Sequence, residues 1–139
     1  MVRKVRILLA DDQPMIYVAV ASLLKPTYKI VAYVGDGKAL VQAAMRMNPD
    51  VIVTDISMPI LNGIEAANTL RNFGSTSRII FLTIHQDLDY VKACFDAGAL
   101  AYVSKPRMST DLLSAIEEAL VGRSFVFPIS KTCAIRSPV

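Results

Sequence analysis

Short apolar runs alternate with stretches of helical periodicity along most of this sequence, and the alternation limits the folds open to it. The runs cover residues 5–10, 30–34, 51–54, 79–83 and 99–103. Their apolar residues are consecutive, which is typical of parallel strands covered on both faces. Between the runs, apolar residues recur at spacings of three and four, as on the buried face of a helix. Five strand–helix units joined by right-handed crossovers predict an α/β fold with a doubly wound, five-stranded parallel sheet.

Residues that favour helix ends support these boundaries. Residues expected to stop the helices follow four of the periodic stretches; they are Pro26, Asn48, Pro49, Gly74 and Gly98. Asp36, Asp87 and Ser109 precede the second, fourth and fifth stretches and are predicted N-caps. The periodic pattern ends at Gly122. We therefore expect one domain at 1–122 and a linker at 123–139, with no output domain in this chain, although the apolar residues 125–127 are able to pack back on the domain.

Composition excludes disorder and a membrane span. The 139 residues have a mean hydropathy of +0.43, which is too apolar for a disordered chain. The longest uncharged run, residues 13–24, contains Pro14 and is far shorter than the ~20 residues of a spanning helix. The apolar run near the N-terminus is too short for a signal peptide. We therefore expect a cytoplasmic protein.

Charge and cysteine content argue against a nucleic-acid-binding surface and against a cysteine-based metal or redox site. The net charge is +3, and the only tight basic group is Arg3, Lys4 and Arg6, so we expect no nucleic acid to bind this chain itself. Cys94 and Cys133 form no metal or redox motif and suit a reducing compartment.

Polar side chains stand where four of the predicted strands end. Asp11, Asp12, Asp55, Thr83 and Lys105 all occupy such positions. Ligands of open α/β sheets bind outside the carboxyl ends of the strands, so these side chains are expected to converge. Neighbouring carboxylates stay ionised when a cation joins them. Oxygen ligands favour a hard cation, so the sequence predicts a Mg²⁺ site, with Mn²⁺ as the alternative ion.

A carboxylate, Mg²⁺, a hydroxyl and a lysine together suit a phosphoryl group, because the cations neutralise its oxygens and the hydroxyl donates to another. Asp55 follows the central strand and is the expected nucleophile, forming an acyl phosphate. Phosphatases with such an aspartate commonly carry a second aspartate two residues later. Here that residue is Ser57. We expect slow hydrolysis, which suits a signal better than a turnover enzyme.

Four motifs in this order, LLADDQP, VTDISMPILNG, FLT and YVSKP, resemble the receiver domain of bacterial two-component response regulators. The resemblance covers residues 4–122 and is greatest to receivers that precede a LuxR-like helix-turn-helix output domain. It implies the (βα)5 flavodoxin-like receiver fold with strand order 2-1-3-4-5. It also implies a phosphoacceptor regulatory domain rather than an enzyme.

The resemblance also implies roles for single residues. Asp55 accepts the phosphoryl group from a sensor histidine kinase or a small acyl phosphate. Asp12 ligates Mg²⁺ directly, Asp11 acts mainly through water, and the Ser57 backbone carbonyl completes the protein ligands. Lys105 pairs with the phosphoryl oxygens.

The same resemblance implies a conformational switch. Thr83 moves to the phosphoryl group, Tyr102 turns inward behind it, and the surface over residues 88–102 changes. The bond between Lys105 and Pro106 is expected to be cis, and Gly63 is expected to allow a tight turn. Homodimers are expected through helix 1 and helix 5, or through the face formed by helix 4, strand 5 and helix 5.

Alternatives remain at this point. Ile84 stands where a small residue is common, so a pseudo-receiver that binds proteins without being phosphorylated is the runner-up. His85 is expected to be a solvated loop residue, and Gln13 or His85 is a candidate for tuning the attacking water. A nucleotide-binding enzyme is disfavoured because residues 35–37 do not continue into a G-x-G-x-x-G loop.

Overall fold

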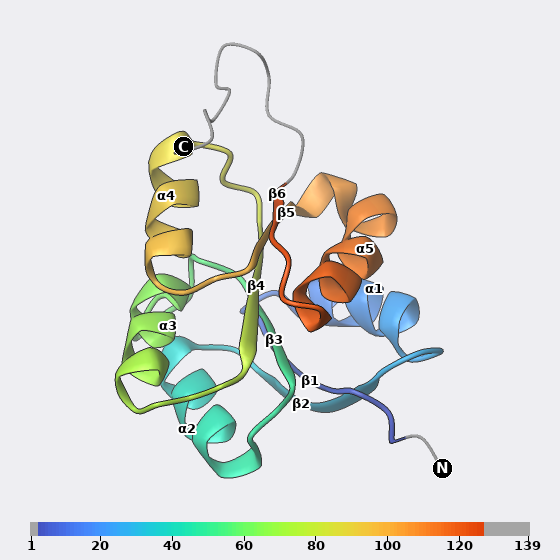
Figure 1. Ribbon diagram of the computed structural model, residues 1–139, viewed down its shortest axis with the longest axis horizontal. Coiled ribbons are helices and arrows are strands. Elements are labelled where there is room, and N and C mark those ends of the chain that lie inside the picture. The colour runs from blue at the N-terminus through green and yellow to red at the C-terminus, as the bar shows by residue number, and fades with distance from the viewer. Residues whose placement is uncertain (1–2, 127–139) are drawn as a thin grey trace.

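The computed structural model describes residues 3–126, which form one six-stranded sheet flanked by helices (Figure 1). The strands are β1 (Arg6–Ala10), β2 (Lys29–Val34), β3 (Val51–Thr54), β4 (Arg78–Thr83), β5 (Ala101–Ser104) and β6 (Phe125–Val126). The helices are α1 (Pro14–Leu24), α2 (Gly37–Met47), α3 (Gly63–Asn72), α4 (Leu88–Asp96) and α5 (Met108–Leu120), with a 3-10 turn at Lys105–Arg107. The sheet order is β2-β1-β3-β4-β5-β6 and every pair is parallel. This confirms the predicted α/β class and the order of the first five strands.

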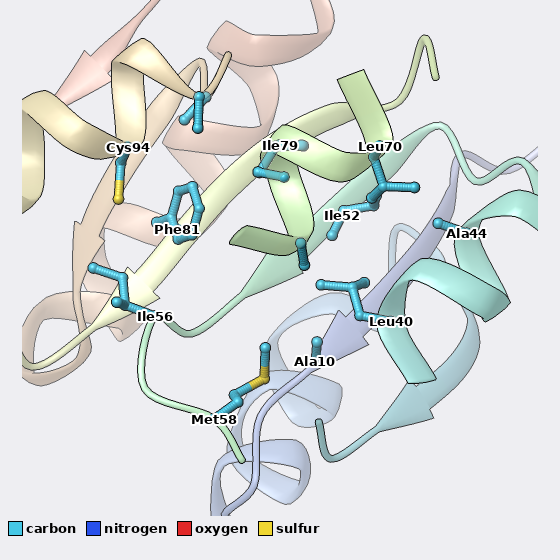
Figure 2. Close-up of a cluster of buried hydrophobic side chains, with 14 of the residues drawn as sticks. Ala10, Leu40, Ala44, Ile52, Ile56, Met58, Leu70, Ile79, Phe81 and Cys94 are labelled. Atoms are coloured by element: carbon cyan, nitrogen blue, oxygen red, sulfur yellow. The ribbon is translucent and has the colours of Figure 1, made fainter. Parts of the chain in front are cut away.

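Two apolar clusters hold the helices on opposite faces of the sheet. Helices α2, α3 and α4 cover one face, and α1 and α5 cover the other (Figure 1). Successive residues of β1 point to alternate faces, so Leu8 joins the first cluster and Leu9 the second. In Figure 2, Ile52 of the sheet lies beside Leu40 and Leu70 from the helices of the first cluster, and Phe81 lies on the side of Cys94. Strands buried on both faces explain why their apolar runs are continuous.

The helix starts agree only partly with the predicted caps. Asp36 is the N-cap of α2, and its carboxylate accepts a hydrogen bond from the Ala39 N–H at 2.7 Å. Asp87 is the N-cap of α4 but makes no side-chain capping hydrogen bond. The prediction for Ser109 is wrong, because α5 continues from the 3-10 turn and begins one residue earlier, at Met108. Sequence reasoning also missed Asn62, whose side chain forms a reciprocal capping box at the start of α3.

Strand β6 was not expected. Phe125 pairs with Ala101 and Val126 with Tyr102, so β6 lies along β5 at the edge of the sheet. Phe125 packs against the cluster beneath α1 and α5. The segment predicted as a linker, 123–139, therefore contains two residues of strand, which follow Arg123 and Ser124. The rest of that segment, including Phe127 and Cys133, lies outside the described residues.

Within residues 3–126, none of the helices has both the length and the apolar character needed to cross a lipid bilayer.

Candidate functional site

The parallel strands bring the ends of β1, β3, β4 and β5 to one edge of the sheet, where β4 and β5 extend two residues beyond β3. Ala10 of β1 pairs with Thr54 of β3, so Asp11 and Asp55 leave the sheet side by side. Thr83 of β4 pairs with Ser104 of β5, which places Lys105 next to the same point. The convergence expected from the sequence is therefore observed.

Three carboxylates lie close together at this edge. One oxygen from each of Asp11, Asp12 and Asp55 falls within 4.8 Å of the others. Asp11 and Asp55 are buried, with exposed fractions of 1% and 6%, whereas Asp12 is exposed. The cluster thus has two buried oxygen donors and one facing solvent, which fits a hard divalent cation that retains some of its waters. The residues predicted to hold Mg²⁺ through their carboxylates are therefore brought together, and the part of the Ser57 carbonyl stays a prediction.

Lys105 bridges the two buried carboxylates. Its Nζ lies 2.8 Å from Oδ2 of Asp11 and 2.8 Å from Oδ2 of Asp55. The same Nζ donates to Oε1 of Gln13 at 3.1 Å. The backbone holds the other carboxylate oxygens, since the Gln13 N–H donates to Oδ1 of Asp11 and the Ile56 N–H donates to Oδ1 of Asp55. Both carboxylates are fixed in orientation by these contacts.

Burial and pairing act in opposite directions on the pKa values of this cluster. Burial raises the pKa of Asp11, and the hydrogen bond from Lys105 offsets part of that rise. Burial favours a lower pKa for Lys105, but hydrogen bonds and charge interactions with Asp11 and Asp55 outweigh it, so the pKa of Lys105 is raised. The lysine is therefore held in its charged form.

The bond between Lys105 and Pro106 is trans, as are the other peptide bonds of residues 3–126, so the expectation of a cis bond is wrong. Pro106 lies in the first turn of the 3-10 helix, where its fixed φ and missing N–H are tolerated. The buried Lys105 reaches both carboxylates with this geometry.

The structure requires glycine at position 63 for a different reason from the one predicted. Its φ is not in the left-handed region; instead, a Cβ at this position would overlap the carbonyl oxygen of Asp55. Within the same loop the residue with positive φ is Ile60, at 73° and with a 77% exposed side chain. The Leu61 N–H donates to the Pro59 carbonyl at 2.8 Å across this residue.

Thr83 and Tyr102, the predicted switch pair, are both fully buried. Both contact the backbone of His85: the His85 N–H donates to Oγ1 of Thr83 at 3.3 Å, and the Tyr102 hydroxyl donates to the His85 carbonyl at 2.7 Å. Burial raises the pKa of the Tyr102 hydroxyl, which keeps it a proton donor. Their part in a switch stays a prediction.

His85 is not the solvated loop residue that we expected. Its ring is half-buried, with Nε2 2.8 Å from Oγ of Ser57. The ring also stacks on Tyr90 of α4, at a centroid distance of 4.4 Å and an interplanar angle of 26°. These contacts join two loops and a helix, and no local sequence pattern indicates them. Ile84, by contrast, is 66% exposed.

The fold and the site define a doubly wound α/β domain with an acidic, lysine-bridged site at the carboxyl edge of its sheet. Residues 7–117 match the family model of the response regulator receiver domain, and the chain belongs to this family of two-component signalling domains.

Named relatives agree with this assignment. The transcriptional regulatory protein PdtaR of Mycobacterium tuberculosis is 37% identical over 116 residues, which cover 83% of this chain and 56% of that protein. The DNA-binding transcriptional activator EvgA of Escherichia coli is 35% identical over 124 residues, which cover 88% of this chain and 60% of that protein. The chain thus spans little more than half the length of these relatives.

Solved structures give the same result. A two-component response regulator of the LuxR family from Aurantimonas sp. SI85-9A1 has a TM-score of 0.85 and 33% identity, covering 91% of both chains. The receiver domain of the putative regulator NarL from Mycobacterium tuberculosis has a TM-score of 0.83 and 25% identity, covering 88% of this chain and 100% of that one. The predicted similarity to LuxR-type receivers is confirmed.

Proposed function

We propose that this domain is a phosphorylation-dependent switch in which Asp55 accepts a phosphoryl group from a sensor histidine kinase. The observation that carries this proposal is the contact between Lys105 Nζ and Oδ2 of Asp55, 2.8 Å long and buried beside Asp11 and Asp12. This arrangement supplies a nucleophilic carboxylate and a fixed cation for the incoming anion. Membership of the receiver family supplies the signalling context.

Phosphoryl transfer needs an oriented carboxylate. One oxygen of Asp55 accepts from the Ile56 N–H at 2.7 Å, and the other contacts Lys105. In the proposed reaction, a carboxylate oxygen of Asp55 forms a bond to phosphorus while the bond from phosphorus to the donor imidazole nitrogen breaks. The electron pair of that bond stays on the imidazole, and the product is an acyl phosphate on Asp55.

Positive charge must then face the phosphoryl oxygens. Lys105 is already held next to Asp55 and needs little movement to pair with them. A bound Mg²⁺ supplies further charge neutralisation, and Asp11, Asp12, Asp55 and the backbone carbonyl of Ser57 are the residues that would hold it.

The acyl phosphate is expected to be long-lived. The residue two positions after Asp55 is Ser57, which has a hydroxyl in place of a carboxylate base. This hydroxyl is hydrogen-bonded to His85. Without a second carboxylate there, activation of a water by general base catalysis is weak. A slow decay suits a regulatory domain that reports a signal.

The response is expected to pass through Thr83 and Tyr102 to the face formed by α4, β5 and α5. That face, or the one formed by α1 and α5, is the proposed homodimer contact. In a longer protein of the kind seen among the relatives, the receiver would control a transcriptional output. We place the chain in the cytoplasm, where a histidine kinase delivers its phosphoryl group.

Intact-protein mass spectrometry tests the proposal. The wild type is treated with acetyl phosphate and Mg²⁺, beside Asp55→Asn and a sample with EDTA. We expect one added phosphoryl group in the wild type with Mg²⁺, and none in Asp55→Asn or with EDTA. The folded state of Asp55→Asn is checked by circular dichroism.

Two other results have distinct meanings. A phosphoryl group on Asp55→Asn moves the site to another residue. No addition to a folded wild type, with acetyl phosphate or with a phosphorylated kinase domain, favours the pseudo-receiver. Addition from the kinase domain alone indicates a site that Ile84 closes to small donors.

A further inference from the structure

His85 contacts four different parts of the site and its surroundings. Its ring nitrogen meets Ser57, its ring face meets Tyr90, its N–H meets Thr83 and its carbonyl meets Tyr102. Ser57 lies two residues from Asp55, and Tyr90 belongs to the first turn of α4. One residue thus joins the loop of the proposed phosphoacceptor to the face proposed to respond.

Helix α4 is weakly stabilised at its N-terminal end, where Tyr90 lies. Its N-cap, Asp87, makes no side-chain capping hydrogen bond. Within its nine residues only Val91 and Cys94 are buried. Without a capping side chain, the first backbone N–H groups of a helix must find other acceptors, and the helix is less stable than a capped one. The stacking of Tyr90 on His85 therefore joins the packing of Val91 in fixing the first turn of α4.

The groups that His85 contacts are also those next to the proposed chemistry. A movement of Thr83 Oγ1 toward a phosphoryl group on Asp55, as proposed above, would change its 3.3 Å contact with the His85 N–H. A phosphoryl group beside Ser57 also adds charge and acceptors within the reach of the Ser57 hydroxyl. Either change alters a contact that sets the position of the His85 ring.

We propose that His85 is a positioning residue that couples loading of Asp55 to the first turn of α4, through its hydrogen bond to Ser57 and its stacking on Tyr90. This inference rests on the proposed function of Asp55. It predicts that phosphorylation of Asp55 reaches α4 through the ring of His85 rather than through the packing of α4 on the sheet. A ligand or modification shifts an element only through contacts that differ between the two states, and these are such contacts.

NMR spectroscopy combined with intact mass measurement tests the coupling. The full chain has one histidine, so its imidazole signals are unambiguous. Spectra are recorded with Mg²⁺ before and after excess acetyl phosphate, and aliquots give the phosphorylated fraction of each sample. The variants are His85→Phe, which keeps a ring against Tyr90 but loses the bond to Ser57, and Tyr90→Leu, which loses the stacking. Tyr90→Phe is the matched control, because it keeps the ring.

We expect the imidazole signals and the amides of residues 88–91 to shift on loading in the wild type and in Tyr90→Phe. At equal phosphorylated fraction, the amide shifts fall to less than half in His85→Phe and Tyr90→Leu. A structural role alone would change the spectra before loading and leave the loading-dependent shifts in place. Full-size shifts in both variants at equal loading overturn the coupling and leave the phosphoacceptor proposal standing. Absence of loading in the wild type overturns both.

Discussion

Replacing Lys105 by methionine tests the electrostatics of the site, because it removes a buried charge and keeps most of the side-chain volume. Lys105 Nζ contacts Asp11 and Asp55 at 2.8 Å each, and all three side chains are at least nine-tenths buried. Removing one partner of a buried ion pair costs about 3–5 kcal/mol, because the remaining charge has no compensation. Here two carboxylates are left facing each other, so we expect a loss in that range in the presence of EDTA.

The size of the loss should depend on divalent cations and on pH. A cation that binds Asp11, Asp12 and Asp55 replaces the missing ammonium, so Mg²⁺ should stabilise Lys105→Met more than the wild type. The pKa of Asp11, already raised from 3.8 by burial, should rise further without Lys105. An acid whose folded pKa is raised gives stability that is present below its unfolded pKa and is lost as pH rises through the folded one. The deficit should therefore be smaller at about pH 5 than at about pH 8.

Urea unfolding followed by circular dichroism measures these differences. The wild type, Lys105→Met and the control Lys38→Met, at an exposed lysine of α2, are compared with EDTA and with Mg²⁺. The control should match the wild type throughout. Two results would refute the reasoning: a loss of unfolding free energy below about 1 kcal/mol in EDTA, or equal stabilisation of all three proteins by Mg²⁺. Breaking a buried ion pair is expected to destabilise the protein by more than that.

Three further predictions concern single positions. Gly63→Ala should destabilise the domain by about 1–3 kcal/mol in urea unfolding, because its Cβ overlaps the Asp55 carbonyl and forces the loop to shift; a change near zero would mean that the loop adapts freely. Asp36→Ala should cost about 1 kcal/mol and Asp87→Ala clearly less, since the Asp36 side chain makes a capping hydrogen bond and that of Asp87 does not; equal costs would contradict the assignment. Cys94 should resist iodoacetamide in the folded protein, because burial raises its pKa to about 12, and peptide mapping should find it alkylated after denaturation only.

The sheet and most of the acidic site could be predicted from the sequence, and the reason is geometric. Strands buried on both faces leave continuous apolar runs, and parallel strands bring the residues after them to one edge. The convergence of Asp11, Asp55 and Lys105 could be predicted from their positions after the strands alone. The bridging position of Lys105 between both carboxylates needed the structure, because it depends on the path of the 3-10 turn.

Other features depend on contacts between segments far apart in the sequence. Nothing local marks His85 as a partner of Ser57, 28 residues away. The role of Gly63 depends on the backbone of Asp55 passing beside it, which periodicity does not reveal. Phe125 and Val126 are too short a run to be recognised as a strand without β5 beside them. Ser109 fits the cap pattern, but the preceding 3-10 turn had already started the helix.

The left-handed backbone of Ile60 has a consequence for how firmly the loop after β3 keeps its shape. A left-handed conformation costs a residue with a Cβ roughly 1–2 kcal/mol, and β-branching adds to the crowding. The side chain is 77% exposed, so burial within residues 3–126 returns little of that energy. The loop that carries Ser57 is therefore held in a higher-energy backbone state by hydrogen bonds such as that from the Gly63 N–H to the Ile56 carbonyl, 2.8 Å long. Any event that weakens those bonds releases the stored energy, so this loop has a lower threshold for rearrangement than the strands that it connects.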